Sequence, residues 1–274
     1  MTYIIRITII ILLTLLTQKA KCQTDTSIAA IATDYGKVMA FTKQPYLHYT
    51  TVTTMQSMPI FEAKDTATLR GEFFKCLDNF YSNNGLEEIY IQDSFLVSVN
   101  HERKSIWISK VDMASKNKMD LLSVTSMQMQ ALLIKNYAST QMVLNDSTSR
   151  LDFSAKEKNN SKAISTSLRL EYNSKIFLPT ILEIKAKVRQ PAEEEILAAI
   201  NNENIDINKI YEVIDGVNFL VRTQEMHIVF NDINYAEAIA IKMPSWKTVL
   251  HYDTMQNEFI ATLSYTGYEV TSTF

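Results

Sequence analysis

The sequence predicts an α+β protein built on a large curved antiparallel sheet, an incomplete β-barrel, with helices packed on its concave face. Three observations lead to this prediction. From residue 46 onward, most segments place apolar residues at every second position, which is the period of a half-buried strand. Short turn signals such as Asn83-Asn84-Gly85 separate these segments, as they do in antiparallel hairpins. Two longer segments, 25–42 and 119–137, have helical spacing instead.

The N-terminus has the layout of a secretory signal peptide. Arg6 precedes an uncharged apolar run over residues 7–16, and a polar stretch follows the run. The run is too short for a membrane-spanning helix, which needs about 20 apolar residues. We therefore expect residues 1–22 to be a signal peptide and the protein to be exported, with a periplasmic location in a bacterial cell.

Cys22 leaves three outcomes open for the N-terminus. Ala20 and Cys22 can form the small pair of an ordinary cleavage site. A lipid on Cys22 fits worse, because Lys19 and Lys21 stand where a lipid-attachment signal has apolar and small residues. The third outcome is an apolar run retained as an anchor. After simple cleavage Cys76 is the remaining cysteine, so we expect no disulfide within the chain and a buried thiol.

The charge of the chain argues against nucleic acid as a partner. The chain has 27 Lys and Arg and 30 Asp and Glu, which give a formal net charge of −3. Loss of residues 1–22 removes Arg6, Lys19 and Lys21 and makes the net charge −6. A chain of this charge has no basic footprint for nucleic acid and no polybasic patch for an anionic membrane surface.

The elements follow from local patterns. Residues 25–42 are expected to form an amphipathic helix, and residues 46–55 are rich in the Tyr, Thr and Val that suit a strand. Residues 68–111 then predict an antiparallel meander in which Trp107 lies on the opposite face from its neighbours in the last strand. The meander has predicted strands at 68–82, 86–92, 95–100 and 105–111.

A second helix, 119–137, interrupts the strands, and a short helix is predicted at 191–201. Both lie within one predicted domain: residues 23–235 form its sheet, and residues 236–274 are a C-terminal extension with further strands. The remaining predicted strands are 141–144, 150–155, 164–172, 177–189, 211–214, 217–222, 226–230, 247–252 and 259–264.

Catalytic and metal motifs are missing from the sequence. The four histidines lack the spacing of a metal site, and no nucleophile elbow, phosphate loop or dinucleotide fingerprint occurs. In Glu87-Glu88 one carboxylate must point away from the other, because successive strand residues face opposite sides. We therefore expect no enzyme activity, no metal and no cofactor.

A candidate ligand site follows from the apolar faces. The 12 methionines can pack an ordinary core or line an apolar cavity between sheet and helices. If the helix 119–137 lies over the concave face, its apolar side meets the meander there. The candidate ligand-binding residues are Phe95, Val97, Ile106 and Ile108 from the meander and Leu122, Met129 and Leu133 from the helix.

Two segments resemble the LolA/LolB-like periplasmic lipoprotein carriers. They are QDSFLVSVNHERKSIWISKVD and SRLDFSAKEKNNSKAISTSLRLEYNSKIFLPTILEIKAK, within a resemblance that covers residues 25–235. It implies a half-open antiparallel barrel with helices as a lid over a cavity for acyl chains. The chain departs from the family in its extension, 236–274, and in lacking a match to the carriers' functional arginine. The pattern positions of the second segment are Phe153, Ile164, Leu168, Leu170, Ile181 and Ile184.

Three functions remain open at this level. The leading expectation is a non-catalytic periplasmic protein that binds an apolar ligand, the acyl chains of a lipid or lipoprotein. The alternative is a structural or accessory scaffold of the cell envelope, with envelope proteins as partners and no ligand cavity. The third is an enzyme of unrecognised type, which convergent polar groups in a pocket would favour.

Overall fold

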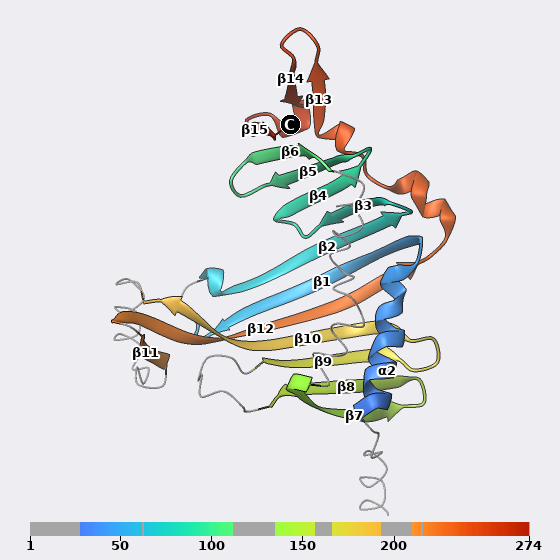
Figure 1. Ribbon diagram of the computed structural model, residues 1–274, viewed down its shortest axis with the longest axis vertical. Helices are drawn as coiled ribbons and strands as arrows, with labels where there is room; N and C mark the ends of the chain where they lie inside the picture. Colours follow the sequence, from blue (N-terminus) through green and yellow to red (C-terminus); the bar gives the residue numbers. More distant parts are fainter. Residues whose placement is uncertain are drawn as a thin grey trace, which may run out of the picture.

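A computed structural model describes residues 28–61, 63–111, 135–156, 166–192, 210–214 and 216–273. Thirteen strands in this part of the chain form one open sheet, antiparallel except where β15 pairs with β6 (Figure 1). The strands, in order across the sheet, are β15 (Glu269–Thr273), β6 (Ser105–Lys110), β5 (Phe95–Asn100), β4 (Glu87–Gln92), β3 (Asn79–Asn83), β2 (Thr66–Cys76), β1 (Tyr46–Met58), β12 (Val217–Asn234), β10 (Leu178–Pro191), β9 (Thr166–Asn173), β8 (Thr148–Ala155) and β7 (Tyr137–Asn145), with β11 (Tyr211–Ile214) beside β12.

The predicted large open antiparallel sheet is therefore confirmed. The predicted first helix is also present, as α2 (Ile28–Met39) and the short 3-10 helix η2 (Ala40–Lys43) that continues it. Residues 119–134 of the second predicted helix lie outside the described residues, and Tyr137 already begins β7. The packing of two helices on a concave face stays a prediction.

Helix α2 lies on one face of the sheet, across its β7–β10 end (Figure 1). Its buried side chains Ile31, Tyr35 and Val38 pack on Leu151 and Leu170. These two leucines pair across β8 and β9, so their side chains point to the same side. We call this side the helix face. It also includes the positions in register with these leucines, Leu182 and Ile228.

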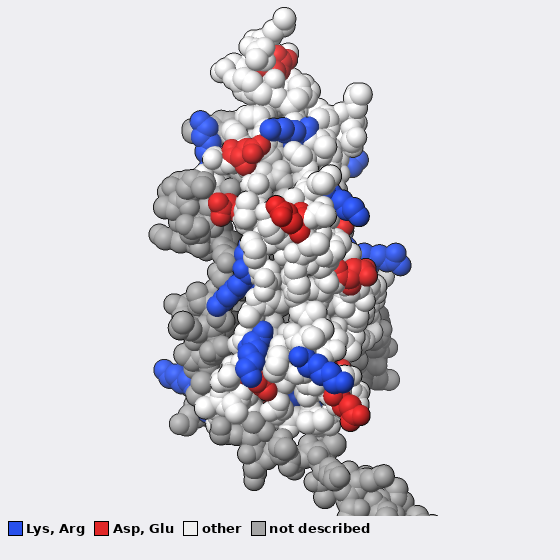
Figure 2. All heavy atoms as spheres, turned by 90° about the vertical axis from the view of Figure 1, so that its right-hand side faces the viewer, with Lys and Arg blue, Asp and Glu red and all other residues white. Residues whose placement is uncertain are grey.

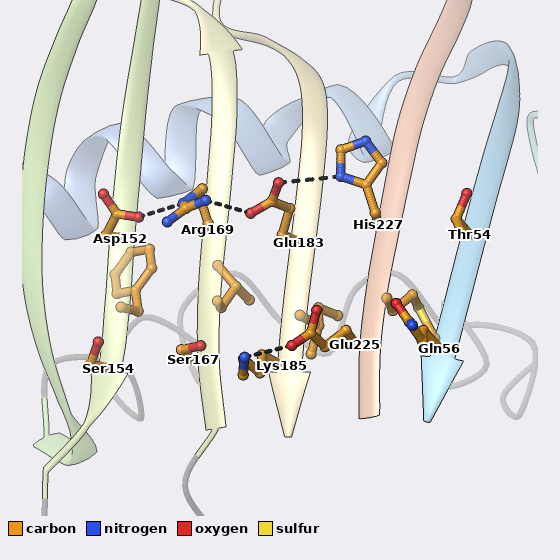
Figure 3. Close-up of a pocket in the computed structure, with 14 residues that line it drawn as sticks. Thr54, Gln56, Asp152, Ser154, Ser167, Arg169, Glu183, Lys185, Glu225 and His227 are labelled. Atoms are coloured by element: carbon orange, nitrogen blue, oxygen red, sulfur yellow. Dashed lines mark hydrogen bonds and ion pairs between the residues drawn. The ribbon is translucent and has the colours of Figure 1, made fainter. Parts of the chain in front are cut away.

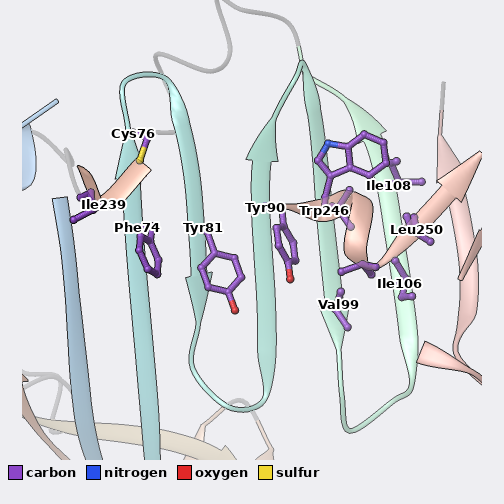
Figure 4. Close-up of a cluster of buried hydrophobic side chains, with 12 residues drawn as sticks. Phe74, Cys76, Tyr81, Tyr90, Val99, Ile106, Ile108, Ile239, Trp246 and Leu250 are labelled. Atoms are coloured by element: carbon purple, nitrogen blue, oxygen red, sulfur yellow. The ribbon is translucent and has the colours of Figure 1, made fainter. Parts of the chain in front are cut away.

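The opposite face is covered at the other end of the sheet by a C-terminal segment, residues 236–273. Phe73 contacts Phe80 and lies in the cluster with Phe41 that continues the helix face, whereas Phe74, its neighbour, packs with Ile239. Because successive strand residues alternate sides, the C-terminal segment and α2 lie on opposite faces. Figure 4 shows Trp246 and Leu250 of this segment beside the strands of the meander.

The C-terminal segment is a chain of short elements. It crosses the sheet and then returns along the far edge, where β15 pairs in parallel with β6. The hairpin of β13 and β14 projects beyond this edge (Figure 1). The elements are η4 (Glu237–Lys242), η5 (Trp246–Thr248), β13 (Leu250–Asp253), β14 (Glu258–Ala261), η6 (Leu263–Tyr265) and β15.

Several predicted boundaries are wrong. The strand expected at 259–264 ends at Ala261, because Leu263–Tyr265 forms η6. The single strand expected at 68–82 is two strands, because Leu77 has a φ of 56° and its N–H donates to the carbonyl of Pro45 at 2.7 Å. The strands expected at 217–222 and 226–230 are one continuous strand, β12. The strand expected at 247–252 begins as η5 and becomes extended only at Leu250. A helix was expected at 191–201, but Pro191 is the last residue of β10. Residues 193–201 lie outside the described residues.

The expectation of a buried thiol is met. Cys76 is a free, buried thiol in the cluster with Phe74, and burial raises its pKa. On the side of the molecule shown in Figure 2, acidic and basic side chains alternate without forming an area of one sign. Within the described residues, no helix has the length and apolar character needed to cross a membrane.

Candidate functional site

A groove of about 470 Å³ crosses five strands on the face opposite α2 (Figure 3). Strand pairing places one polar residue from each strand side by side. His227 of β12 lies between Thr54 of β1 and Glu183 of β10, and Arg169 lies between Glu183 and Asp152. All five point away from the helix face, because each alternates with a residue that points toward it.

The charged members of this row are hydrogen-bonded to each other. Arg169 donates from Nε to Asp152 at 2.9 Å and from Nη1 to Glu183 at 2.7 Å. The other oxygen of Glu183 lies 3.2 Å from Nδ1 of His227. The hydrogen bond to Asp152 raises the pKa of Arg169, so this guanidinium stays charged. The row is thus a preformed hydrogen-bonded ladder in which Arg169 links two carboxylates.

A second row lies two residues further along each strand, on the same face, and is polar as well. Lys185 and Glu225 form an ion pair of 2.5 Å, and Ser154, Ser167 and Gln56 complete the row. Every charged side chain that lines the groove has a partner of opposite sign. No group of three or more potential metal ligands occurs in the described part of the chain. With Arg150, which donates from Nε to Asp152 at 2.9 Å, three cationic side chains offset the three carboxylates, and the groove offers many hydrogen-bonding groups.

The helix face carries an apolar row directly behind the groove. Register pairs Phe153 with Leu168, Leu168 with Ile184, Ile184 with Met226, and Met226 with Met55. Phe153 is buried against Tyr35 of α2, with an edge-to-face ring contact of 5.7 Å. The other four residues are half-buried. The apolar row thus begins beneath α2 and continues past it.

The sequence-predicted meander residues lie elsewhere. Val97, Ile106 and Ile108 are at most 1% exposed and share the cluster with Trp246 and Leu250 of the C-terminal segment. Figure 4 shows Ile106 and Ile108 beside Trp246 and Leu250. Phe95 packs at its margin, 5.4 Å from the Trp246 ring. The structure therefore brings these four together, on the face opposite α2. The other three candidates, Leu122, Met129 and Leu133, lie outside the described residues, and the ligand-binding role of all seven stays a prediction.

A buried polar cluster holds the C-terminal segment to the meander. Glu88 is buried, as the alternation of Glu87 and Glu88 predicts for one of the two. It accepts hydrogen bonds from the hydroxyls of Tyr90 at 2.5 Å, Tyr265 at 3.0 Å and Tyr81 at 3.3 Å. Nε2 of His101 lies 2.9 Å away. Tyr265 belongs to the C-terminal segment, so the cluster joins it to strands β3 and β4.

Burial also changes the acidity of these tyrosines. It raises the pKa of Tyr81 and of Tyr265 to about 12, and the pKa of Tyr90 further still, with Glu88 adding to each shift. Protons on these hydroxyls are needed for the hydrogen bonds to Glu88. The cluster is therefore a set of donors around one acceptor, and it has a structural explanation.

Sequence reasoning did not identify the polar row of the groove. Its signal is present as charged residues at every second position, such as Arg150 with Asp152 and Glu183 with Lys185. Alternation of this kind indicates a solvated strand face. It does not say which residues of different strands become neighbours.

Comparison with known proteins adds two solved structures. A DUF1329 family protein from Desulfovibrio piger is 9% identical, with a TM-score of 0.26, and the match covers 84% of this chain and 99% of that one. A LolA superfamily protein from Nitrosomonas europaea is 9% identical, with a TM-score of 0.27, over 78% of this chain and 97% of that one.

Both TM-scores are below 0.5, so neither match is evidence for the function of this chain. No protein-family model and no curated protein matches the sequence. Function must therefore be argued from the two faces of the sheet.

Proposed function

We propose that the protein is an exported, non-catalytic binding protein that holds an apolar chain, such as an acyl chain of a lipid or lipoprotein, on the helix face. One observation carries the proposal: the apolar row from Phe153 to Met55 continues beyond α2 as half-buried side chains. Five strands spaced about 4.8 Å apart make this row about 19 Å wide. The signal-peptide layout of residues 1–22 supports export to the periplasm.

The mechanism is sequestration. Each methylene group that leaves water for an apolar surface contributes about 0.8 kcal/mol, so a chain lying along the row is bound without any directional contact. Burial against Ile184 and Met226 at the centre of the row would supply most of this energy, because Phe153 is already covered by α2. No bond is made or broken.

Two isoleucines of β10 provide a matched test. Ile184 lies in the apolar row, whereas Ile181 points to the opposite face, and both are half-buried. Ile184→Trp fills the row and is expected to weaken uptake of a fluorescent fatty acid by about tenfold or more, as the loss of two buried methylenes would. Ile181→Trp is expected to leave uptake unchanged.

The outcome can also reject the proposal. If wild-type protein takes up no fatty acid, phospholipid or lipopeptide, the helix face is not a carrier site. Equal effects of the two substitutions would show that uptake occurs at another place.

The second candidate function is an envelope scaffold, and the closed end of the sheet favours it. Here Trp246, Val249 and Leu250 of the C-terminal segment pack on the meander, so the predicted residues Val97, Ile106 and Ile108 form a solid core. A ligand could reach these residues only if the C-terminal segment moved away. Under this hypothesis neither face has an apolar ligand, and the protein acts through protein partners.

A further inference from the structure

The groove on the face opposite α2 has the properties of a second binding site. It is separate from the helix face proposed for the acyl chain. Its volume of about 470 Å³ lies in the range of small-ligand sites, roughly 300–1,000 Å³. All described lining residues belong to the five strands β1, β8, β9, β10 and β12, so the C-terminal segment, in its described part, does not fill it. The charged row is between about one quarter and one half exposed.

The paired charges decide which ligand fits. Asp152 contacts both Arg150 and Arg169, and Arg169 also contacts Glu183. Lys185 pairs with Glu225, so three cationic side chains offset three carboxylates. A charged ligand would have to break one of these pairs to gain a new one. A neutral ligand can bind without disturbing them, because hydrogen bonds to ionised groups are available alongside each ion pair.

Donors and acceptors are left over for such a ligand. Arg169 uses Nε and Nη1, and His227 uses Nδ1, in the contacts of the row. Among the described residues, Nη2 of Arg169 and Nε2 of His227 have no further hydrogen-bond partner. Ser167 adds a hydroxyl that both donates and accepts. Arg169 and His227 lie in the charged row, and Ser167 lies two residues from Arg169 along β9.

We propose that this groove binds a neutral polyhydroxylated ligand, a segment of a glycan chain. Each sugar hydroxyl is both a donor and an acceptor, and it matches a surface where guanidinium, carboxylate and hydroxyl groups alternate. The ion pairs hold the side chains in place before binding, so less rotamer entropy is lost. A row about 19 Å wide, at about 4.8 Å per strand, suits an extended oligosaccharide better than a single sugar.

The test uses neutral oligosaccharides and one pair of serine variants. Maltohexaose, cellohexaose and chitohexaose are titrated into the full-length protein by calorimetry and by NMR. We expect at least one to bind with a Kd of about 1 mM or tighter. Ser167→Trp fills the groove and is expected to weaken binding by about tenfold or more. Ser98→Trp, on β5 and also half-buried, is the control and is expected to bind as wild type does.

A second variant protects the test against misfolding. If circular dichroism shows that Ser167→Trp does not fold, Arg169→Lys takes its place, because it keeps the charge but removes the planar fork. It is expected to weaken binding severalfold. If the variant that folds binds the oligosaccharide as tightly as the wild-type protein does, the ligand is not in this groove and the proposal fails.

Two other results overturn the proposal. One is the absence of any binding up to about 10 mM oligosaccharide, with groove resonances unchanged. The other is binding of a sulfated or phosphorylated oligosaccharide when the neutral ones do not bind, which would show that the groove prefers anionic ligands. Because Ile184→Trp acts on the helix face, it is expected to leave glycan binding intact, so this test is independent of the acyl-chain proposal.

Discussion

The same face of one sheet is a core at one end and a surface at the other. Along the meander, Val99, Ile106 and Ile108 are at most 1% exposed, because Trp246 and Leu250 of the C-terminal segment cover them. Along β8–β12 the same face presents paired charges to the groove. The alternation of side chains along a strand is therefore not enough to distinguish core from binding surface. The segment that packs over that face of the sheet decides it.

The helix face divides differently. Here α2 covers the far end of the sheet and leaves part of an apolar row only half-buried. Each end of the sheet is thus closed on one face by a different element. The closed areas should account for stability and the half-open areas for binding.

Removal of the C-terminal segment should have the largest effect on the difference between the two ends of the sheet. Truncation after Tyr235 uncovers Val97, Val99 and Ile106 and removes their packing partners. We expect loss of cooperative unfolding of the meander and strong binding of an apolar dye. Truncation after Tyr268, which removes β15 alone, is the control and should have a smaller effect. An unchanged melting curve after the first truncation would contradict the core assignment.

Two isoleucine truncations should sharpen the difference between closed and half-open areas. Ile108→Ala leaves a cavity in a fully buried cluster and is expected to cost about 3–4 kcal/mol of unfolding free energy. Ile184→Ala, in the half-buried row, should cost about 1 kcal/mol. Urea denaturation measures both. Equal losses would mean that the apolar row is as tightly packed as the core.

The buried carboxylate should matter more than its neighbour in sequence. Glu88→Gln weakens the acceptor of three tyrosine hydroxyls and changes the contact with Nε2 of His101, at a cost of about 2–3 kcal/mol. Glu87→Gln, on an exposed side chain, should change the unfolding free energy by less than about 0.5 kcal/mol. If the two variants have the same midpoint in urea, the cluster does not hold the C-terminal segment.

Alkaline pH should weaken the closed end. The pKa of Tyr81 is raised to about 12, so the folded protein keeps a proton that the unfolded chain loses near pH 10. Its contribution is complete below pH 10 and is lost as the pH rises from 10 to 12, on the order of 2 kcal/mol. Tyr81→Phe should flatten this part of the stability profile, whereas Tyr252→Phe, on the exposed hairpin, should not.

The smallest effect is expected in the groove. Arg169→Ala removes two ion pairs that are well exposed to water, and such pairs contribute about 1 kcal/mol or less. We expect an unfolding midpoint close to that of wild type, with addition of 1 M salt reducing even this difference. A loss larger than that of Ile184→Ala would indicate that the ladder is structural and not a preformed binding surface.

Much of the strand order was predictable, because local chemistry marks it. Residues 95–100 were predicted with the bounds of β5, since polar turns stand on both sides, and Trp107 was correctly placed opposite Ile106 and Ile108. The break at Leu77 was not predictable. It has no Gly or Pro at the turn, and its left-handed backbone is held by a hydrogen bond to Pro45, a contact made only by the folded chain.

The candidate site was less predictable than the strands. Asp152, Arg169 and Glu183 are separated by 17 and 14 residues in the chain, and only strand register makes them neighbours. Register here depends on irregularities such as the one between Pro179 and Ile181, which shifts β10 against β9. The burial of Val97 and Ile108 by the C-terminal segment could not be predicted either, because it depends on the packing of residues more than a hundred positions later in the chain.

The parallel pairing of β15 with β6 has a consequence for biosynthesis. Among the described residues, Glu269 is the first to pair with the outer edge of β6, opposite Ser105, so this edge has no described partner while the 158 residues between Lys110 and Glu269 are made. During that time an exposed edge can recruit another copy of the chain. Nascent or truncated protein should therefore aggregate through this edge. A chaperone that shields strand edges during export would raise the yield of soluble full-length protein.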